Sequence, residues 1–201
     1  MTAVVRKPFI VVVSGPSGVG KSTVVGGVLE RVEGFSRSVS LATRSPRKGE
    51  VDGEDYHFVD SEEFGRRREA GELLEWAEVH GNLYGTPLDF VEGKLAGGSC
   101  VMLEIDVQGG MDVKGKRPDA VLIFLLPPDF GELERRLRGR GTDDDDVISR
   151  RLENARMEMS FYDKYDYVVV NDDIGRCVGD ILGIIRSESL RLDRTSVDIT
   201  Y

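Results

Sequence analysis

The fold of this chain is decided by the stretch Phe9-Ile-Val-Val-Val-Ser-Gly15-Pro-Ser-Gly-Val-Gly-Lys21-Ser22. Residues 9–13 are an unbroken run of β-branched and aromatic side chains, which is typical of a strand buried on both faces of a parallel sheet. The next residues match the pattern Gly-x-x-x-x-Gly-Lys-Ser/Thr, and a helical stretch follows from Lys21 to about Val32. A strand, a glycine-rich loop and a helix in this order form the context in which that pattern binds phosphate.

The chemistry of such a loop predicts a nucleoside triphosphate as ligand. Its glycines let successive backbone N–H groups turn inward around a phosphate, and the helix N-terminus adds a favourable dipole. We expect Lys21 to bridge the β- and γ-phosphates and Ser22 to offer its hydroxyl to Mg²⁺. The alternative, a chance glycine-rich turn, is disfavoured by the complete context. The predicted triphosphate site comprises Gly15, Pro16, Ser17, Gly18, Val19, Gly20, Lys21, Ser22 and Thr23.

Composition restricts the class of protein. The chain has 201 residues, 40% hydrophobic and 31% charged, with a net charge of −9. One domain with a proper core is expected at this length, and the acidic balance argues against a protein that coats nucleic acid. Cys100 and Cys177 cannot form a disulfide framework, and no cysteine–histidine cluster has metal-site spacing. The longest apolar run, residues 120–126, is too short to cross a bilayer. We therefore expect a cytoplasmic protein with no membrane partner.

The rest of the chain alternates strands and helices around an insertion. Apolar runs at 100–105, 120–126 and 167–170 predict buried strands, and helices are expected at 129–138, around 148–159 and at 181–192. The charged segment between 36 and 97 interrupts this rhythm with short strands at 55–59 and 73–79 and a helix at 61–70. In it, Asp60 and Glu63 have the spacing of a capping box, and Thr86 precedes Pro87 as a helix cap.

These patterns predict an α/β fold with a three-layer core around a parallel sheet. We divide a single domain, residues 1–201, into a core at about 1–35, 98–128 and 152–201, an insertion at about 36–97 and a lid at about 129–151. The tail after Leu192 carries no recognisable pattern, and we expect it to be poorly ordered.

The insertion carries the groups that would accept a phosphoryl group. Arg44 and Arg47 have the fork geometry that grips a phosphate, and the hydroxyls of Ser40 and Tyr56 add donors. A solvated basic loop before a proline turn is the alternative. An Asn-Lys-x-Asp motif, which a GTPase would show, is absent from the sequence.

The wider set of motifs resembles the guanylate kinase family, which belongs to the nucleoside monophosphate kinase class of phosphate-loop proteins. The resemblance runs in order from about Phe9 to Asp173. It comprises the phosphate loop, Thr43-Arg-x-Pro-Arg-x-Gly-Glu50, Asp55-Tyr-x-Phe58, Glu75-Trp-Ala77, Gly81-Asn-Leu-Tyr-Gly-Thr86, Leu103-Glu-Ile-Asp-Val-Gln-Gly109, Arg136-Leu-Arg-Gly-Arg-Gly-Thr142, Arg150-Arg-Leu152 and Val170-Asn-Asp-Asp173. The sequence departs from the family at Leu41, Ala42 and Leu83, and Glu104 stands where Asp also occurs.

The resemblance implies transfer of the ATP γ-phosphoryl group to GMP, and to dGMP, with Mg²⁺, in a fold with a GMP-binding insertion and a mobile lid. It implies that the GMP phosphate is held by Ser40, Arg44, Arg47, Tyr56 and Tyr84, and that guanine is read by Glu75, Thr86 and Asp106. Arg136, Arg140 and Arg151 would stand with Lys21 near the transferring group, and Asn171 near adenine.

Simpler structural interpretations exist for several of these residues. Glu75 suits an exposed strand face, Asp106 a helix N-cap and Tyr84 a packing aromatic, while Arg136 and Arg140 suit a basic helix end. At the level of function, the alternatives are a non-catalytic guanylate-kinase-like module that binds phosphorylated ligands, and a kinase for another nucleotide. The intact Lys21-Ser22 pair disfavours the first alternative, and Glu75 with Asp106 disfavours the second.

Overall fold

The apolar run before the phosphate loop forms β2 (Ile10–Ser14), the central strand of a five-stranded sheet. The computed structural model describes residues 2–47, 49–79, 81–139 and 145–199. The other strands of this sheet are β3 (Phe35–Arg37), β8 (Cys100–Glu104), β9 (Val121–Leu126) and β10 (Tyr167–Val170). Their order is β10-β9-β2-β8-β3, and every neighbouring pair is parallel. The predicted parallel sheet is confirmed.

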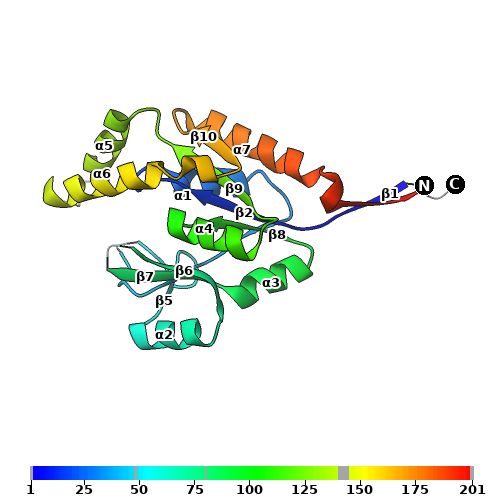
Figure 1. Ribbon diagram of the computed structural model, residues 1–201, viewed down its shortest axis with the longest axis horizontal. Helices are drawn as coiled ribbons and strands as arrows, with labels where there is room; N and C mark the ends of the chain where they lie inside the picture. The colour runs from blue at the N-terminus through cyan, green and yellow to red at the C-terminus, as the bar shows by residue number, and fades with distance from the viewer. Residues whose placement is uncertain (1, 48, 80, 140–144, 200–201) are drawn as a thin grey trace.

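Helices cover both faces of this sheet. Successive side chains of β2 point to opposite faces, and all of them are buried, so both faces need a covering layer. Val11 and Val13 pack with side chains of α1 (Lys21–Leu29) and α7 (Ile174–Ser189). Ile10 and Val12 pack with side chains of α3 (Leu88–Ala96) and α4 (Val107–Lys116). The result is the three-layer core that the unbroken apolar strands predicted (Figure 1).

The insertion forms a sheet of its own. Its strands are β4 (Leu41–Ala42), β5 (His57–Phe58), β6 (Leu73–Val79) and β7 (Asn82–Pro87), in the order β5-β4-β7-β6. A small core of Leu41, Phe64 and Leu73 joins this sheet to α2 (Ser61–Glu69). Asp60 caps α2 by accepting the Glu63 N–H at 2.8 Å, whereas the Glu63 carboxylate pairs with Arg66 and Arg67. Figure 1 shows this layer beside α4, below the central sheet.

A helical pair lies at the opposite side of the core. It consists of α5 (Phe130–Arg138), capped by Asp129 at the Glu132 N–H, and α6 (Asp145–Met159). Leu133, Leu137 and Ala155 form their common apolar cluster. A short 3₁₀ turn (Tyr162–Lys164) then leads to β10.

Three expectations about single elements are wrong. Thr86 does not cap a helix: Pro87 is the N-cap of α3, and the Thr86 hydroxyl donates to Glu75. Strand β10 is not buried on both faces, because it is an edge strand whose Val168 and Val170 are 44% and 43% exposed. Helix α7 begins at Ile174, earlier than expected, because Asp173 caps it at the Arg176 N–H.

The tail also differs from expectation. A 3₁₀ turn (Leu192–Arg194) is followed by β11 (Thr195–Ile199), which pairs antiparallel with β1 (Thr2–Arg6) in a separate two-stranded ribbon. Arg194 fixes the start of this ribbon, since its guanidinium donates to the Asp119 carbonyl at 2.7 Å and lies over the Phe9 ring. Figure 1 shows the ribbon projecting from the core. In the part of the chain that the structure describes, no helix is long and apolar enough to span a membrane.

Candidate active site

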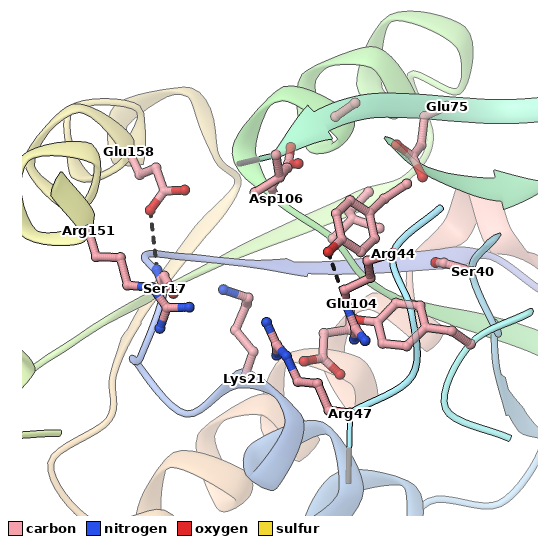
Figure 2. A pocket seen from close by; sticks show the side chains of 15 residues that line it. Ser17, Lys21, Ser40, Arg44, Arg47, Glu75, Glu104, Asp106, Arg151 and Glu158 are labelled. Atoms are coloured by element: carbon pink, nitrogen blue, oxygen red, sulfur yellow. Dashed lines mark hydrogen bonds between the residues drawn. The ribbon is translucent and has the colours of Figure 1, made fainter. Parts of the chain in front are cut away.

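One cleft lies between the phosphate loop, the inserted sheet and α6 (Figure 2). We call the loop at residues 15–23 its loop half. Its insertion half consists of predicted site residues from the inserted segment, together with Asp106. The cleft brings together ten of the predicted residues: Ser17, Lys21, Ser40, Arg44, Arg47, Tyr56, Glu75, Tyr84, Asp106 and Arg151. The sequence motifs therefore converge on one place, although they are dispersed along the chain.

The glycines of the loop half are required by its backbone. Gly15 approaches β9 so closely that a Cβ there would lie 2.4 Å from the Leu125 carbonyl oxygen. Gly20 has a φ of 99°, in the left-handed region, and is the N-cap of α1. Side chains are disfavoured at both positions. The loop consequently places the N-terminus of α1 beside the cleft, which favours an anion there.

Lys21 and Ser22 stand where the loop meets the cleft. The Lys21 ammonium donates to the carbonyl oxygens of Gly15 at 2.6 Å and Pro16 at 3.3 Å. The Ser22 hydroxyl donates to Glu104, whose other carboxylate oxygen accepts from Arg37 at 2.7 Å. Glu104 was noted in the sequence only as a departure. Its place at the carboxyl end of β8, beside β2, could have drawn attention to it, because ligands of open parallel sheets bind at that edge.

Two predicted residues lie behind the loop instead of lining the cleft. The Asn171 side-chain amide is 3% exposed and donates to the Val19 carbonyl at 2.7 Å. Arg136 donates to the same carbonyl at 3.1 Å and to the Asn171 carbonyl at 3.0 Å, while Glu132 accepts from its Nε at 2.6 Å. Both side chains thus hold the back of the phosphate loop in this structure. Their roles near adenine and near the transferring group stay predictions. Arg140 lies outside the described residues.

Hydroxyls and guanidinium groups gather on one side of the insertion half. The Arg44 Nε donates to the Tyr84 hydroxyl at 3.2 Å, and its guanidinium carbon lies 4.8 Å from the centre of the Tyr56 ring. Tyr84 is therefore both a packing aromatic and a polar partner, and its ring meets that of Tyr56 edge-on. Figure 2 shows Arg47 extending from this side toward Lys21. A phosphate in this part of the cleft would meet several donors.

The deepest part of the insertion half is acidic. Glu75 is 3% exposed, and its carboxylate accepts from the Thr86 hydroxyl at 2.5 Å. Burial raises the pKa of Glu75 to about 7, and the nearby negative charge of Asp106 adds to this rise. Its location excludes the interpretation as an exposed strand residue. Gly109 makes room for it, since a Cβ there would lie 2.5 Å from Glu75 Oε2.

Asp106 combines both interpretations considered for it. Its Oδ1 accepts the Gly109 N–H at 2.9 Å, so it is the N-cap of α4. The same side chain also lines the cleft near Glu75 (Figure 2). A cap and a cleft residue are compatible, because a carboxylate has several acceptor positions.

Glu158 is a cleft residue that sequence reasoning missed. It extends from α6, and its Oε2 accepts the Ser17 N–H at 3.2 Å (Figure 2). Burial raises the pKa of this carboxyl group, opposed by the positive charge of Lys21. Its spacing from Arg151 is seven residues, two helical turns, which places both on one face of α6. That spacing was a usable signal, since Arg151 was already a candidate.

Known proteins of one family resemble this chain along most of its length. Residues 6–188 match the family model described as Guanylate kinase. A guanylate kinase of Enterococcus faecalis is 52% identical over 190 residues, which are 94% of this chain and 93% of that protein. One of Aromatoleum aromaticum is 50% identical over 182 residues, 90% of this chain and 89% of the relative.

A solved structure gives the same result. The crystal structure of guanylate kinase from Anaplasma phagocytophilum superposes with a TM-score of 0.83 at 38% identity, covering 96% of this chain and 92% of that one. The sequence match, the fold and the converging cleft residues all lead to one conclusion. The chain belongs to the guanylate kinase family.

Proposed function

We propose that the loop half of the cleft binds ATP and that the insertion half binds GMP. The chain is an ATP:GMP phosphotransferase: it transfers the γ-phosphoryl group of ATP to GMP and produces ADP and GDP. The observation that carries the proposed roles is that Lys21 of the phosphate loop and the buried Glu75 line one cleft. A phosphate grip and a base-reading group at its two ends suit two nucleotides that meet through their phosphates.

On the loop half, we propose that the backbone N–H groups of residues 15–23 and the Lys21 ammonium hold the ATP phosphates. The Lys21 ammonium already donates to two carbonyl oxygens of the loop. When a phosphate binds, the ammonium would donate to phosphate oxygens in place of these carbonyls. The positive charge of Lys21 then stabilises the charge that develops in the transition state. Arg151, which reaches the cleft from α6, would act in the same way.

Phosphoryl-transfer kinases generally need a divalent metal ion, and we propose Mg²⁺ held by Ser22. The donor set fits: the Ser22 hydroxyl and the Glu104 carboxylate meet at the mouth of the loop, and oxygen donors are those that Mg²⁺ prefers. When bound with ATP, the ion would neutralise charge on the β- and γ-phosphates. Glu104 would be the second residue, beside Ser22, on the side of the cleft where the ion binds.

On the insertion half, we propose that Ser40, Arg44, Arg47, Tyr56 and Tyr84 hold the GMP phosphate. This places a phosphate oxygen of GMP as the nucleophile toward the γ-phosphorus, and no protein nucleophile is needed. Glu75 and Asp106 would accept the N1–H and N2 amino donors of guanine. The Thr86 hydroxyl, now donating to Glu75, would turn to guanine O6.

We also propose that the parts of the chain move relative to one another during the reaction. The insertion at about 36–97 and the lid at about 129–151 would close over both substrates and exclude water, which would otherwise hydrolyse ATP. The small core within the insertion supports independent movement of that part. X-ray scattering should show a smaller radius of gyration with GMP and a non-hydrolysable ATP analogue together, whereas an unchanged radius contradicts closure.

Other finer points stay predictions. Use of dGMP is expected because the proposed phosphate and base contacts leave out the ribose 2′-hydroxyl. A cytoplasmic setting is supported by the free thiols of Cys100 and Cys177. The absence of a nucleic-acid partner is expected from the net charge of −9. The non-catalytic module is not favoured, because the phosphate loop and the predicted acceptor residues share one cleft.

The decisive experiment is an ADP-release assay with ATP, Mg²⁺ and a panel of nucleoside monophosphates. We expect rapid turnover with GMP and little with AMP, CMP or UMP. Excess EDTA should abolish turnover, and Mg²⁺ should restore it. Robust GDP formation in excess EDTA would contradict the metal proposal, while equal use of all monophosphates would contradict the assignment of Glu75 and Asp106.

A further inference from the structure

The carboxylate of Glu50 lies behind the arginines of the insertion half. It accepts from Arg44 Nη1 at 2.6 Å and from Arg44 Nη2 at 2.7 Å, which is a two-pronged ion pair. The pair is well shielded, with the side chains of Arg44 and Glu50 only 10% and 19% exposed. The resemblance to the family included Glu50 in a motif but assigned it no role. Glu50 does not line the cleft, so any effect on substrate must pass through its neighbours.

Glu50 also fixes the backbone of the second arginine. Its Oε2 accepts the Arg47 N–H at 2.7 Å, and its own N–H donates to the Arg47 carbonyl at 3.1 Å. These reciprocal bonds join residue 47 to residue 50. One carboxylate therefore holds the side chain of Arg44 and the main chain of Arg47, two of the five residues proposed to hold the GMP phosphate.

The ion pair changes what Arg44 can offer to a phosphate. Bonds to Tyr84, Ser45 and Glu50 use four of the five N–H hydrogens of its guanidinium. The fork that the sequence suggested for gripping phosphate is thus turned toward Glu50. At most one hydrogen of the Arg44 guanidinium is left for a phosphate, and its charge is balanced by that of Glu50. The unbalanced attraction for a phosphate must come largely from other cations, of which Arg47 is the nearest in sequence.

We propose that Glu50 is a positioning residue for the GMP phosphate. It orients the side chain of Arg44 and the main chain of Arg47, while its own charge balances the positive charge of Arg44. This inference rests on the proposed function. Two effects of removing its charge oppose each other. Loss of orientation weakens phosphate binding, whereas an uncompensated Arg44 attracts a phosphate more strongly. The orientation effect dominates. Glu50 already holds the Arg44 side chain in place, so Arg44 does not lose conformational entropy again when the substrate binds.

The test compares GMP with guanosine, which lacks the phosphate, as ligands of the full chain by calorimetry. In Glu50→Gln, the side-chain NH₂ would face the Arg44 donors. We expect GMP affinity to fall by about tenfold or more, the scale of one charge-assisted hydrogen bond, while guanosine affinity stays within about twofold. In kinetics, KM for GMP should rise and KM for ATP should stay nearly constant.

A matched control separates geometry from net charge. Glu54→Gln makes the same charge change at an exposed position of the same segment, and it should leave both affinities unchanged. Glu50→Asp keeps the charge, so it should bind GMP more tightly than Glu50→Gln does. It also provides the test if Glu50→Gln folds poorly. In an Arg44→Ala background, Glu50→Gln should cost less than in the wild type, since part of its effect passes through Arg44.

Three outcomes would overturn the inference. Equal or tighter GMP binding by Glu50→Gln would show that charge balance outweighs orientation. An equal loss for GMP and guanosine would indicate general disruption of the inserted sheet. The same loss in Glu54→Gln would indicate a charge effect alone. Failure of the proposed function looks different, because the wild-type chain itself would then bind guanosine as tightly as GMP.

Discussion

The loop half and the insertion half of the cleft are built in different ways. The loop half is one contiguous strand–turn–helix, in which glycines at fixed positions shape the backbone and one lysine lines the cleft. The insertion half collects side chains from β6, β7, α4 and the segments around β4, spread over residues 40 to 106.

The difference fits what each half is proposed to recognise. All nucleotides carry phosphates, so a backbone cradle suffices for them. Bases differ at their edges, and only side chains of chosen chemistry can distinguish them. Burial then affects how strongly they discriminate, and Glu75, the proposed base reader, is buried. Four experiments test this division.

The largest effect should concern base choice. A site built to hydrogen-bond a group rejects its absence by roughly 10⁴ or more, so kcat/KM should favour GMP over AMP on that scale. Glu75→Gln should lose most of this preference through slower use of GMP, because the amide faces guanine donors with a donor of its own. The matched control is Glu78→Gln, at an exposed position of the same strand. Full discrimination in Glu75→Gln would assign base reading elsewhere.

The second effect concerns the lysine of the loop half. We expect Lys21→Ala to lower kcat by at least about a hundredfold, on the scale of losing one preorganised electrostatic group. The ratio of GMP to AMP use should change little, because Lys21 is proposed to touch only phosphates. Lys94→Ala, which removes an exposed lysine of α3, should behave as the wild type. A folded Lys21→Ala enzyme with a normal rate would mean that the loop half only binds.

The third effect is a pH dependence confined to the insertion half. Burial raises the pKa of Glu75 to about 7, so the carboxyl group becomes protonated as pH falls through that value. Only the ionised form accepts both guanine donors. GMP affinity should therefore fall below about pH 7, by at most tenfold per pH unit, and level off above it. Affinity for an ATP analogue should change less over the same range. Glu75→Gln should remove the part of the GMP dependence centred near pH 7 and leave the part that comes from the GMP phosphate, whose second pKa is about 6. A wild-type GMP affinity that does not change with pH would contradict the proposed role of the Glu75 carboxylate.

The smallest effect should come from a region outside both halves. Truncation after Arg194 removes β11 and leaves β1 without a partner, while the Arg194 contacts to Asp119 and Phe9 remain. Because no cleft residue lies in this ribbon, kcat and KM should stay within about twofold, as for most surface changes. A large loss of activity would show that the ribbon supports the cleft.

Sequence reasoning succeeded for several local features, although it misplaced the start of α7 and the cap of α3. The apolar run of β2, the phosphate loop and the caps at Asp60, Asp129 and Asp106 depend on neighbours within a few residues, so their patterns are visible in the chain. It failed where distant partners decide. The tail looked featureless because β11 pairs with a strand at the other end of the chain. Likewise, β10 looked like a central strand because an edge position depends on sheet order.

The candidate site shows the same division. The phosphate loop and the motifs that resemble those of guanylate kinases are visible in the chain alone, since spacing along the chain defines a strand–loop–helix unit. The burial of Glu75, the hold of Glu50 on Arg44, the position of Arg136 and Asn171 behind the loop, and the contact of Glu158 with Ser17 depend on the folded arrangement. The physical reason is that burial, pKa and hydrogen-bond partners depend on groups that packing brings together from distant parts of the chain.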